Sequence, residues 1–434
     1  MKLRNVRVIL WSILLVLGMT GCGRQAETER VEAIPADYEG RMNWWKDQAN
    51  TDSITCWYTS ETDLDWLENA AQGFEQEYGI RVEAVYYDGV NLFADMNQAS
   101  QNGSGPDVYL VGNDQLELAW KSGMAEENTW LDDTFWQNNY PEVAKQAVTY
   151  GQKQYGYPVY FDTYCLVYDA NLLQTAPASI DDILAFLDEY EDTGSTKAIF
   201  RWDVADPYIN TMFFASYVDL FGENGDQPAS FQVNNEKAIE TMEYFQSLSE
   251  YLWMNKNNIS HDTVRSRIKD KTLVLGLCKS DILPTLYEMQ AQETVEAEQT
   301  DDAEEEKADY RISYVPSLTA GLSSTTLSTT YAALVNPYGT DTSIANMFGL
   351  YLSYGIADQQ YAGNGKLSVR TMDGLDEMQT IIYAQYVNSK PVPKVMVLGD
   401  YLAQSGIAFD AIWSGKDVKE QLEQLQSAME QKIK

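Results

Sequence analysis

Histidine is nearly absent from this sequence: the 434 residues include one, His261, which lies among polar neighbours. A histidine-rich metal site is therefore excluded, and a Ser-His-Asp triad is disfavoured because it needs an imidazole as its general base. The sequence also lacks a GxxxxGK[ST] loop and a complete GxGxxG turn, the common cradles for nucleotide phosphates. We expect a protein that holds no metal ion or cofactor and that is not an enzyme.

Basic residues are scarce as well. The chain has 30 Lys and Arg against 65 Asp and Glu, which gives a formal net charge of −35. A field of that sign repels phosphate backbones and anionic lipid head groups. We therefore expect no nucleic acid partner, and the expected partners are neutral or cationic small solutes and a protein receptor.

Cysteine is limited to four residues, and no two of them form a CxxC pair. Cys56 and Cys278 lie inside apolar runs that are typical of strands. Small buried hydrophobic side chains are therefore a better interpretation than a disulfide framework. If Cys22 carries a lipid, three cysteines remain, Cys56, Cys165 and Cys278, and an odd number cannot all be paired in disulfides.

The longest apolar run lies at the N-terminus. Lys2, Arg4 and Arg7 precede or flank it, and it covers residues 8–17 with Ser12 as its only polar member. A membrane-spanning helix needs about 20 apolar residues, which this run does not reach. The basic, apolar and small-residue order instead predicts a signal peptide that is removed.

The junction Gly21-Cys22 resembles the bacterial lipobox, with Met19 at the position where that motif prefers Leu. The resemblance implies cleavage after residues 1–21 and lipid attachment to Cys22. The polar residues 22–50 are then expected to form a tether. This predicts an exported protein, lipid-anchored to the outer face of the bacterial cytoplasmic membrane. The alternative is an ordinary secretory signal with an incidental cysteine.

About 410 residues follow the signal peptide, too many for one hydrophobic core, so two domains are expected. Alternating and helical hydrophobic patterns predict a βαβαβ start, with strands at 54–58, 80–86 and 107–111 and helices at 64–78 and 92–99. Such units form mostly parallel sheets with helices on both faces, and ligands bind beyond the carboxyl ends of the strands.

Three later segments are predicted to be helices, and one acidic segment is predicted to be irregular. Residues 179–190, 236–252 and 418–433 carry helical patterns. Residues 293–309 hold nine acids against one Lys, which predicts a solvated surface loop or insertion.

Several short segments, in this order, resemble the family 1 extracellular solute-binding proteins of ABC importers, the maltose/maltodextrin-binding group. They are ITCWY at 54–58, FEQEYGIRV at 74–82, GPDV at 105–108, YP at 157–158 followed by 164–173, and DPY at 206–208. The resemblance implies a two-lobed periplasmic-binding-protein fold of type II, with two α/β lobes, each a mostly parallel sheet flanked by helices, joined by a hinge. Lobe 1 would hold 51–160 plus 331–365, and lobe 2 would hold 163–327 plus 369–434.

The same resemblance implies ligand contacts at strand ends and crossovers. The candidates that it gives are Glu61, Asp114, Asp162, Asp206, Tyr208 and Tyr401. Tyr331 and Trp202 are further candidates, for stacking on a ligand ring. Carboxylates accept hydrogen bonds from sugar hydroxyls, and aromatic faces stack on sugar rings.

Ordinary structural roles compete with these assignments. Asp114 could cap a helix, Glu61 could sit in a first helical turn, and Trp202 or Tyr331 could pack in a core rather than stack on a ligand. Val111 and Ser280 stand where maltose binders carry Trp. We therefore expect a smaller or differently shaped glycan or a polyol rather than a maltodextrin.

The resemblance thus implies a monomeric substrate-binding lipoprotein that captures a small solute, a sugar or oligosaccharide, and delivers it to the transmembrane subunits of an ABC permease. A lipoprotein that presents its ligand to a sensor kinase would share every one of these features. A glycosidase that uses two of Asp114, Asp162 and Asp206 as its acid and its base or nucleophile is the remaining enzymatic alternative.

Overall fold

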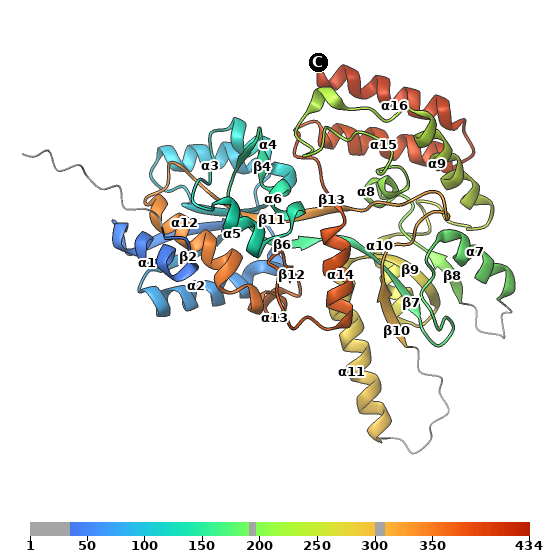
Figure 1. Ribbon diagram of the computed structural model, residues 1–434, viewed down its shortest axis with the longest axis horizontal. Helices are drawn as coiled ribbons and strands as arrows, with labels where there is room; N and C mark the ends of the chain where they lie inside the picture. The colour runs from blue at the N-terminus through green and yellow to red at the C-terminus, as the bar shows by residue number, and fades with distance from the viewer. Residues whose placement is uncertain (1–34, 191–196, 300–308) are drawn as a thin grey trace, which may run out of the picture. The chain divides into compact units, whose positions relative to one another are not determined.

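The structure is a computed structural model in which residues 35–190, 197–299 and 309–434 are described. They belong to the unit Pro35–Lys434, whose strands form two main sheets and one short hairpin (Figure 1). The predicted signal peptide, Cys22, the first part of the predicted tether and residues 300–308 of the acidic segment lie outside the described residues.

The larger sheet has seven strands in the order β12-β6-β11-β3-β1-β2, with β13 paired to β11. Its strands are β1 (Ser53–Tyr58), β2 (Arg81–Tyr86), β3 (Val108–Gly112), β6 (Tyr157–Asp162), β11 (Leu327–Val335), β12 (Leu367–Ser368) and β13 (Lys390–Pro391). Strand β1 pairs in parallel with β2 and β3, and helices α2 (Leu64–Tyr78) and α3 (Leu92–Gln101) connect them. The predicted βαβαβ order is confirmed.

The smaller sheet has four strands in the order β10-β7-β9-β8. Its strands are β7 (Tyr164–Asp169), β8 (Ala198–Arg201), β9 (Leu273–Lys279) and β10 (Tyr310–Ser313), and the separate hairpin consists of β4 (Thr149–Tyr150) and β5 (Lys153–Gln154). Only Thr163 separates β6 of the larger sheet from β7 of the smaller one.

Both sheets are mixed, so the prediction of mostly parallel sheets is wrong. Strand β11 lies between β3 and β6 and runs antiparallel to both. Strand β7 runs antiparallel to β9 and β10, while β8 and β9 are parallel. A helical crossover forces neighbouring strands to be parallel, but these strands arrive from distant parts of the chain without that constraint.

Helices cover both sheets, and α2 and α3 are two of them (Figure 1). The others are α1 (Tyr38–Gln48), α4 (Leu116–Lys121), α5 (Asp133–Asn139), α6 (Glu142–Ala147), α7 (Ile180–Glu189), α8 (Pro207–Asn210), α9 (Glu236–Ser247), α10 (His261–Lys269), α11 (Leu283–Gln299), α12 (Thr342–Leu350), α13 (Gln360–Asn364), α14 (Glu377–Val387), α15 (Leu398–Trp413) and α16 (Val418–Ile433). Helices α15, α16 and α9 pack on one another (Figure 1). The predicted apolar face of α16 is confirmed, because Leu422, Leu425 and Met429 are buried.

Two expectations about the polar segments are wrong in part. Residues 38–48 form helix α1 instead of a tether, because Met42 and Trp45 lie one turn apart and both are buried. Arg41 is also buried, with its guanidinium against the Phe135 ring and on Asp132 at 3.2 Å. The first part of the acidic segment is helical as well, since α11 continues to Gln299.

The three cysteines of the described residues are buried and free. The prediction for Cys56 and Cys278 is therefore confirmed, and Cys165 lies directly opposite Cys278 on β7 and β9. Among the residues that the structure describes, no helix has the length and apolar character needed to cross a membrane.

Candidate functional site

A cavity of about 250 Å³ lies where strands of the two sheets end. Its lining combines carboxylates, a lysine, hydroxyls, tyrosine rings and a few aliphatic side chains, namely Asp114, Asp162, Thr163, Tyr164, Tyr208, Lys279, Leu327, Thr329, Tyr331 and Val392. Asp162 and Lys279 are the last residues of β6 and β9, and Asp114 lies in the 3₁₀ turn that follows β3. Ligands of α/β sheets bind at such carboxyl ends.

Asp114 lies in the turn after β3, and Gln115 Nε2 donates to its Oδ2 at 2.7 Å. Helix α4 begins without a side-chain cap, so the capping alternative for Asp114 is wrong. Burial raises the pKa of Asp114 above its ordinary value. Gly112 makes room for this carboxylate, because a Cβ there would collide with Asp114 Oδ1 and press on Thr329.

Asp162 is held by two side chains. Its Oδ1 accepts hydrogen bonds from Lys366 Nζ at 2.6 Å and from Ser280 Oγ at 3.3 Å. Ser280 Oγ in turn accepts the Thr163 amide N–H at 3.1 Å. These contacts fix the carboxylate at the junction of the two sheets and offset its charge with that of Lys366.

Tyr331 provides a flat aromatic wall. Its ring stacks on Tyr160 with centroids 4.6 Å apart and an interplanar angle of 22°. The Tyr160 hydroxyl donates to Asp63 Oδ2 at 2.6 Å, and Asn364 Nδ2 donates to the other oxygen of Asp63 at 2.9 Å. Tyr331 is half-buried and lines the cavity, so it does not pack wholly within the core.

The two polar residues of the acidic-Pro-Tyr segment, Asp206 and Tyr208, have different positions relative to the cavity. Tyr208 lines the cavity, and its pKa is raised by burial and by the nearby charges of Asp114 and Asp206. Asp206 does not line the cavity. It caps α8 through the Tyr208 amide at 2.8 Å, and its other oxygen accepts the Tyr164 hydroxyl at 2.9 Å and faces His261 Nε2 at 2.5 Å.

Residues 69–362 match the model of a family described as bacterial extracellular solute-binding protein. The chain belongs to this family. The match covers more than half of the sequence and includes most of the cavity-lining residues. The family is one of substrate-binding proteins rather than of enzymes.

Relatives of this solute-binding protein include a maltodextrin-binding protein of Bacillus subtilis, 26% identical over 219 residues, which are 47% of this chain and 50% of the relative. A maltotriose-binding protein of Pyrococcus abyssi is 24% identical over 173 residues, 40% of this chain and 37% of the relative. The chain thus spans about half or less of the length of these curated relatives.

Solved structures with the same fold cover more of the chain. A cyclo/maltodextrin-binding protein in complex with maltotetraose superposes with a TM-score of 0.74 and 18% identity, over 89% of this chain and 98% of that one. An extracellular solute-binding protein of Staphylococcus aureus in complex with maltose gives 0.73 and 17% over the same shares. The two-lobed type II fold of this solute-binding protein is therefore confirmed.

Besides Asp206, two more of the residues predicted to contact the ligand do not line the cavity of this solute-binding protein. Tyr401 is fully buried on α15, where its hydroxyl meets Thr211 Oγ1 at 3.0 Å and its ring packs on Phe221 and Phe231, so the prediction that it faces the ligand is wrong. Glu61 is exposed at the start of a short 3₁₀ turn and does not line the cavity.

Trp202 is no stacking candidate either. It is fully buried, donates to Asn210 Oδ1 at 3.0 Å and packs on Trp413, which matches the core-packing alternative. Sequence reasoning overlooked Tyr164, Lys279 and Lys366. Tyr164 and Lys279 lie close in sequence to Asp162 and Ser280, which the sequence analysis did single out. No sequence pattern around Lys366 marks it as a site residue.

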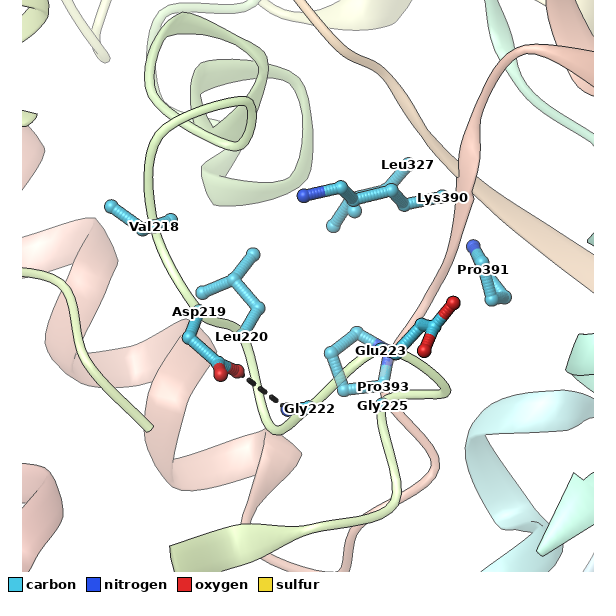
Figure 2. A pocket seen from close by; sticks show the side chains of 10 residues that line it. All are labelled: Val218, Asp219, Leu220, Gly222, Glu223, Gly225, Leu327, Lys390, Pro391 and Pro393. Atoms are coloured by element: carbon cyan, nitrogen blue, oxygen red, sulfur yellow. Dashed lines mark hydrogen bonds between the residues drawn. The ribbon is translucent and has the colours of Figure 1, made fainter. Parts of the chain in front are cut away.

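A second cavity of this solute-binding protein is larger, about 350 Å³, but fewer free polar groups converge on it (Figure 2). Lys390 Nζ donates to the Ala215 carbonyl at 2.6 Å, and the Asp219 carboxylate accepts the Gly222 amide N–H at 2.5 Å. Glu223 is then the one charged lining residue with no hydrogen bond among the described residues. The smaller cavity is therefore the better candidate site.

Proposed function

We propose that this chain is the substrate-binding lipoprotein of an ABC importer, which captures a neutral glycan and delivers it to a membrane permease. The observation that carries the proposal is one cavity in which Asp114 and Asp162 lie with the rings of Tyr208 and Tyr331. Relatives named for maltodextrin, maltotriose and galactooligosaccharide binding support the sugar class.

The chemistry of the cavity suits a sugar. The face of Tyr331, backed by Tyr160, offers an apolar surface for a pyranose ring. Asp114 and Asp162 can accept hydrogen bonds from sugar hydroxyls, while Lys279 and Thr329 can donate hydrogen bonds to hydroxyl oxygens. Such a mixture of one apolar wall and a few polar groups is usual in small-molecule sites.

The size of the cavity favours a short ligand. Sites for drug-sized ligands occupy about 300–1,000 Å³, and this cavity of about 250 Å³ lies below that range. Val111 is buried in β3 and Ser280 binds Asp162, so neither position offers a broad aromatic platform. We propose a mono- or disaccharide or a polyol as the ligand.

We further propose that residues 51–160 plus 331–365 and residues 163–327 plus 369–434 form two lobes that close over the glycan. The cavity lining from both sheets supports this division, because a ligand bound there would contact both and favour the closed form. We propose a monomer that is tethered through a lipid on Cys22.

The test is a thermal-shift screen with mono- and oligosaccharides, polyols and amino acids, because a ligand that binds only the native state raises its melting temperature. A sugar or polyol should raise it, and calorimetry should then give a dissociation constant. A shift with amino acids alone would contradict the proposed ligand class.

The lipid anchor has a separate test. Cys22→Ala should move the protein from membranes to the soluble fraction, and continued membrane association would contradict lipidation at that residue.

A further inference from the structure

Behind the cavity wall lies a chain of three side chains that ends at the one histidine of the sequence. Tyr164, the first residue of β7, lines the cavity and donates its hydroxyl to Asp206 Oδ2 at 2.9 Å. His261, the first residue of α10, places Nε2 at 2.5 Å from the same oxygen. The three residues come from separate elements, so only the fold brings them together.

The Asp206 carboxylate already has three partners within the protein. Its Oδ1 accepts the Tyr208 amide, and its Oδ2 serves both Tyr164 and His261. Asp206 therefore has little capacity left for a ligand, in contrast to the direct contact that its sequence position suggested. Two of its partners line the cavity: the oxygen that faces His261 holds the Tyr164 hydroxyl, and the other oxygen holds the Tyr208 backbone.

Tyr164 is held in one hydrogen-bonding role. Burial, together with the charge and hydrogen bond of Asp206, raises the pKa of Tyr164 well above its ordinary value, so the phenol keeps its proton. The phenol O–H donates its hydrogen bond to Asp206. A phenol oxygen whose proton is committed can still accept a hydrogen bond but cannot donate one.

His261 keeps Asp206 in its accepting form. Burial opposes ionisation of Asp206, but His261, the Tyr208 amide and Tyr164 outweigh that effect, and the pKa of Asp206 lies below its ordinary value. The imidazole is itself positioned by Asp203, whose Oδ2 accepts the His261 backbone N–H at 3.2 Å and lies 3.8 Å from Nε2.

We propose that His261 is a positioning residue of the glycan site: through Asp206 it fixes Tyr164 as a hydrogen-bond acceptor, so that the cavity selects a solute with a hydroxyl donor at that point. This inference rests on the proposed function, because it describes the selectivity of the same cavity. The ligand class that it adds is a polyhydroxyl compound with a free, unsubstituted hydroxyl facing Tyr164.

The first test is a double-mutant cycle, measured by calorimetry with the sugar or polyol found in the screen. His261→Leu should weaken binding about tenfold, as expected for a lost charged hydrogen bond, while His261→Gln, which keeps an N–H donor, should stay within about threefold. In a Tyr164→Phe background, His261→Leu should have no additional effect, because the hydroxyl that shares Asp206 Oδ2 with His261 is gone. Additive losses, or an unchanged affinity in His261→Leu, would overturn the inference.

The second test uses His261 as the only imidazole in the protein. Its NMR signals should shift when the ligand binds to the wild type and should not shift in Tyr164→Phe at saturating ligand. Ligand analogues in which each hydroxyl in turn is replaced by fluorine should include one that the wild type rejects and Tyr164→Phe tolerates, because fluorine cannot donate.

The two levels of the proposal fail differently. If a sugar binds the wild type but neither the imidazole signals nor the variants respond, the role of His261 is wrong and the proposed function stands. If no sugar or polyol binds the wild type in calorimetry, the proposed function is wrong and the inference falls with it.

Discussion

Asp114 and Asp162 face the same cavity, but the protein holds them in opposite ways. Asp162 has an ammonium partner in Lys366 and a hydroxyl donor in Ser280. Asp114 has the amide of Gln115, and its burial raises its pKa. An aspartate that is destabilised as an anion and lies on a cavity surface is poised to gain from the hydroxyl donors of a ligand.

The raised pKa of Asp114 gives a stability prediction. The folded state binds this proton more tightly than the unfolded state, so folding stability is lost as the pH rises from the unfolded pKa through the folded one. Asp114→Asn should therefore melt above the ligand-free wild type at pH 7, and the two should converge near pH 4, where about half of unperturbed Asp side chains are protonated.

Asp162→Asn is the matched control for that experiment. It leaves Lys366 without its carboxylate, so its melting temperature at pH 7 should be below that of the wild type. A lower melting temperature for Asp114→Asn at pH 7 would contradict the description of Asp114 as a strained anion.

Tyr331 allows a separate test of ring stacking. Tyr331→Ala should weaken glycan binding about tenfold or more, because it removes the stacking surface, whereas Tyr331→Phe should stay within about threefold. Calorimetry on both variants checks this. Equal losses in the two variants would show that the hydroxyl, not the ring face, contacts the ligand.

Part of the site could be predicted from the family resemblance together with residue positions. Asp114, Asp162 and Tyr208 stand at strand ends or in crossovers, and they do share a cavity. Asp206 and Tyr401 illustrate the limit. Whether a carboxylate is already saturated, or a helical ring faces inward, depends on partners such as His261 that are distant in sequence.

At the scale of elements, helix α1 shows how a few residues turn a polar segment into folded structure. Asp37 caps it by accepting the Gly40 amide N–H at 2.8 Å, and Trp45 is fully buried beside Trp130, with ring centroids 5.5 Å apart. Sequence periodicity missed the helix because most of its residues are polar and only its inner face is apolar.

Trp45→Ala should therefore cost about 3–5 kcal/mol of unfolding free energy, as truncation of a buried aromatic side chain does. Trp44→Ala, at the half-buried neighbour, should cost clearly less. Denaturant titrations of both variants measure the difference. Equal small effects would mean that residues 38–48 do not pack as a helix.

Residues 300–308 of the acidic segment are expected to be dispensable for ligand binding. No cavity-lining residue comes from α11 or β10, the elements that flank residues 300–308. Replacing 300–308 with a short Gly-Ser link should leave glycan affinity within about threefold of the wild type. A loss beyond about tenfold, with an unchanged melting temperature, would place the segment in the binding site.

The elements themselves were predictable where local pattern decides, as in the βαβαβ start. Strand direction was not, because β11 reaches its place between β3 and β6 from more than 150 residues along the chain. Pairing over that separation depends on the assembled core rather than on hydrophobic alternation within the strand.

At the scale of the whole molecule, the fold places strand ends from two sheets around one small polar cavity. The family match and the shared fold with sugar-complexed binding proteins agree with that arrangement. In the proposed closure of the two lobes, a ligand in this cavity would contact residues of both sheets. The larger cavity shares Leu327 with this one but contains neither Asp114 nor Asp162, so its Glu223 serves as a control for an acidic residue outside the proposed site.

The most direct measurement is a calorimetric titration of the glycan into the wild type, the double variant Asp114→Asn/Tyr331→Ala, and Glu223→Gln. The wild type should bind one glycan per chain and return it chemically unchanged, the double variant should bind about 100-fold more weakly, and Glu223→Gln should match the wild type. An unchanged affinity in the double variant, a loss in Glu223→Gln, or a hydrolysed glycan would contradict glycan capture in this cavity.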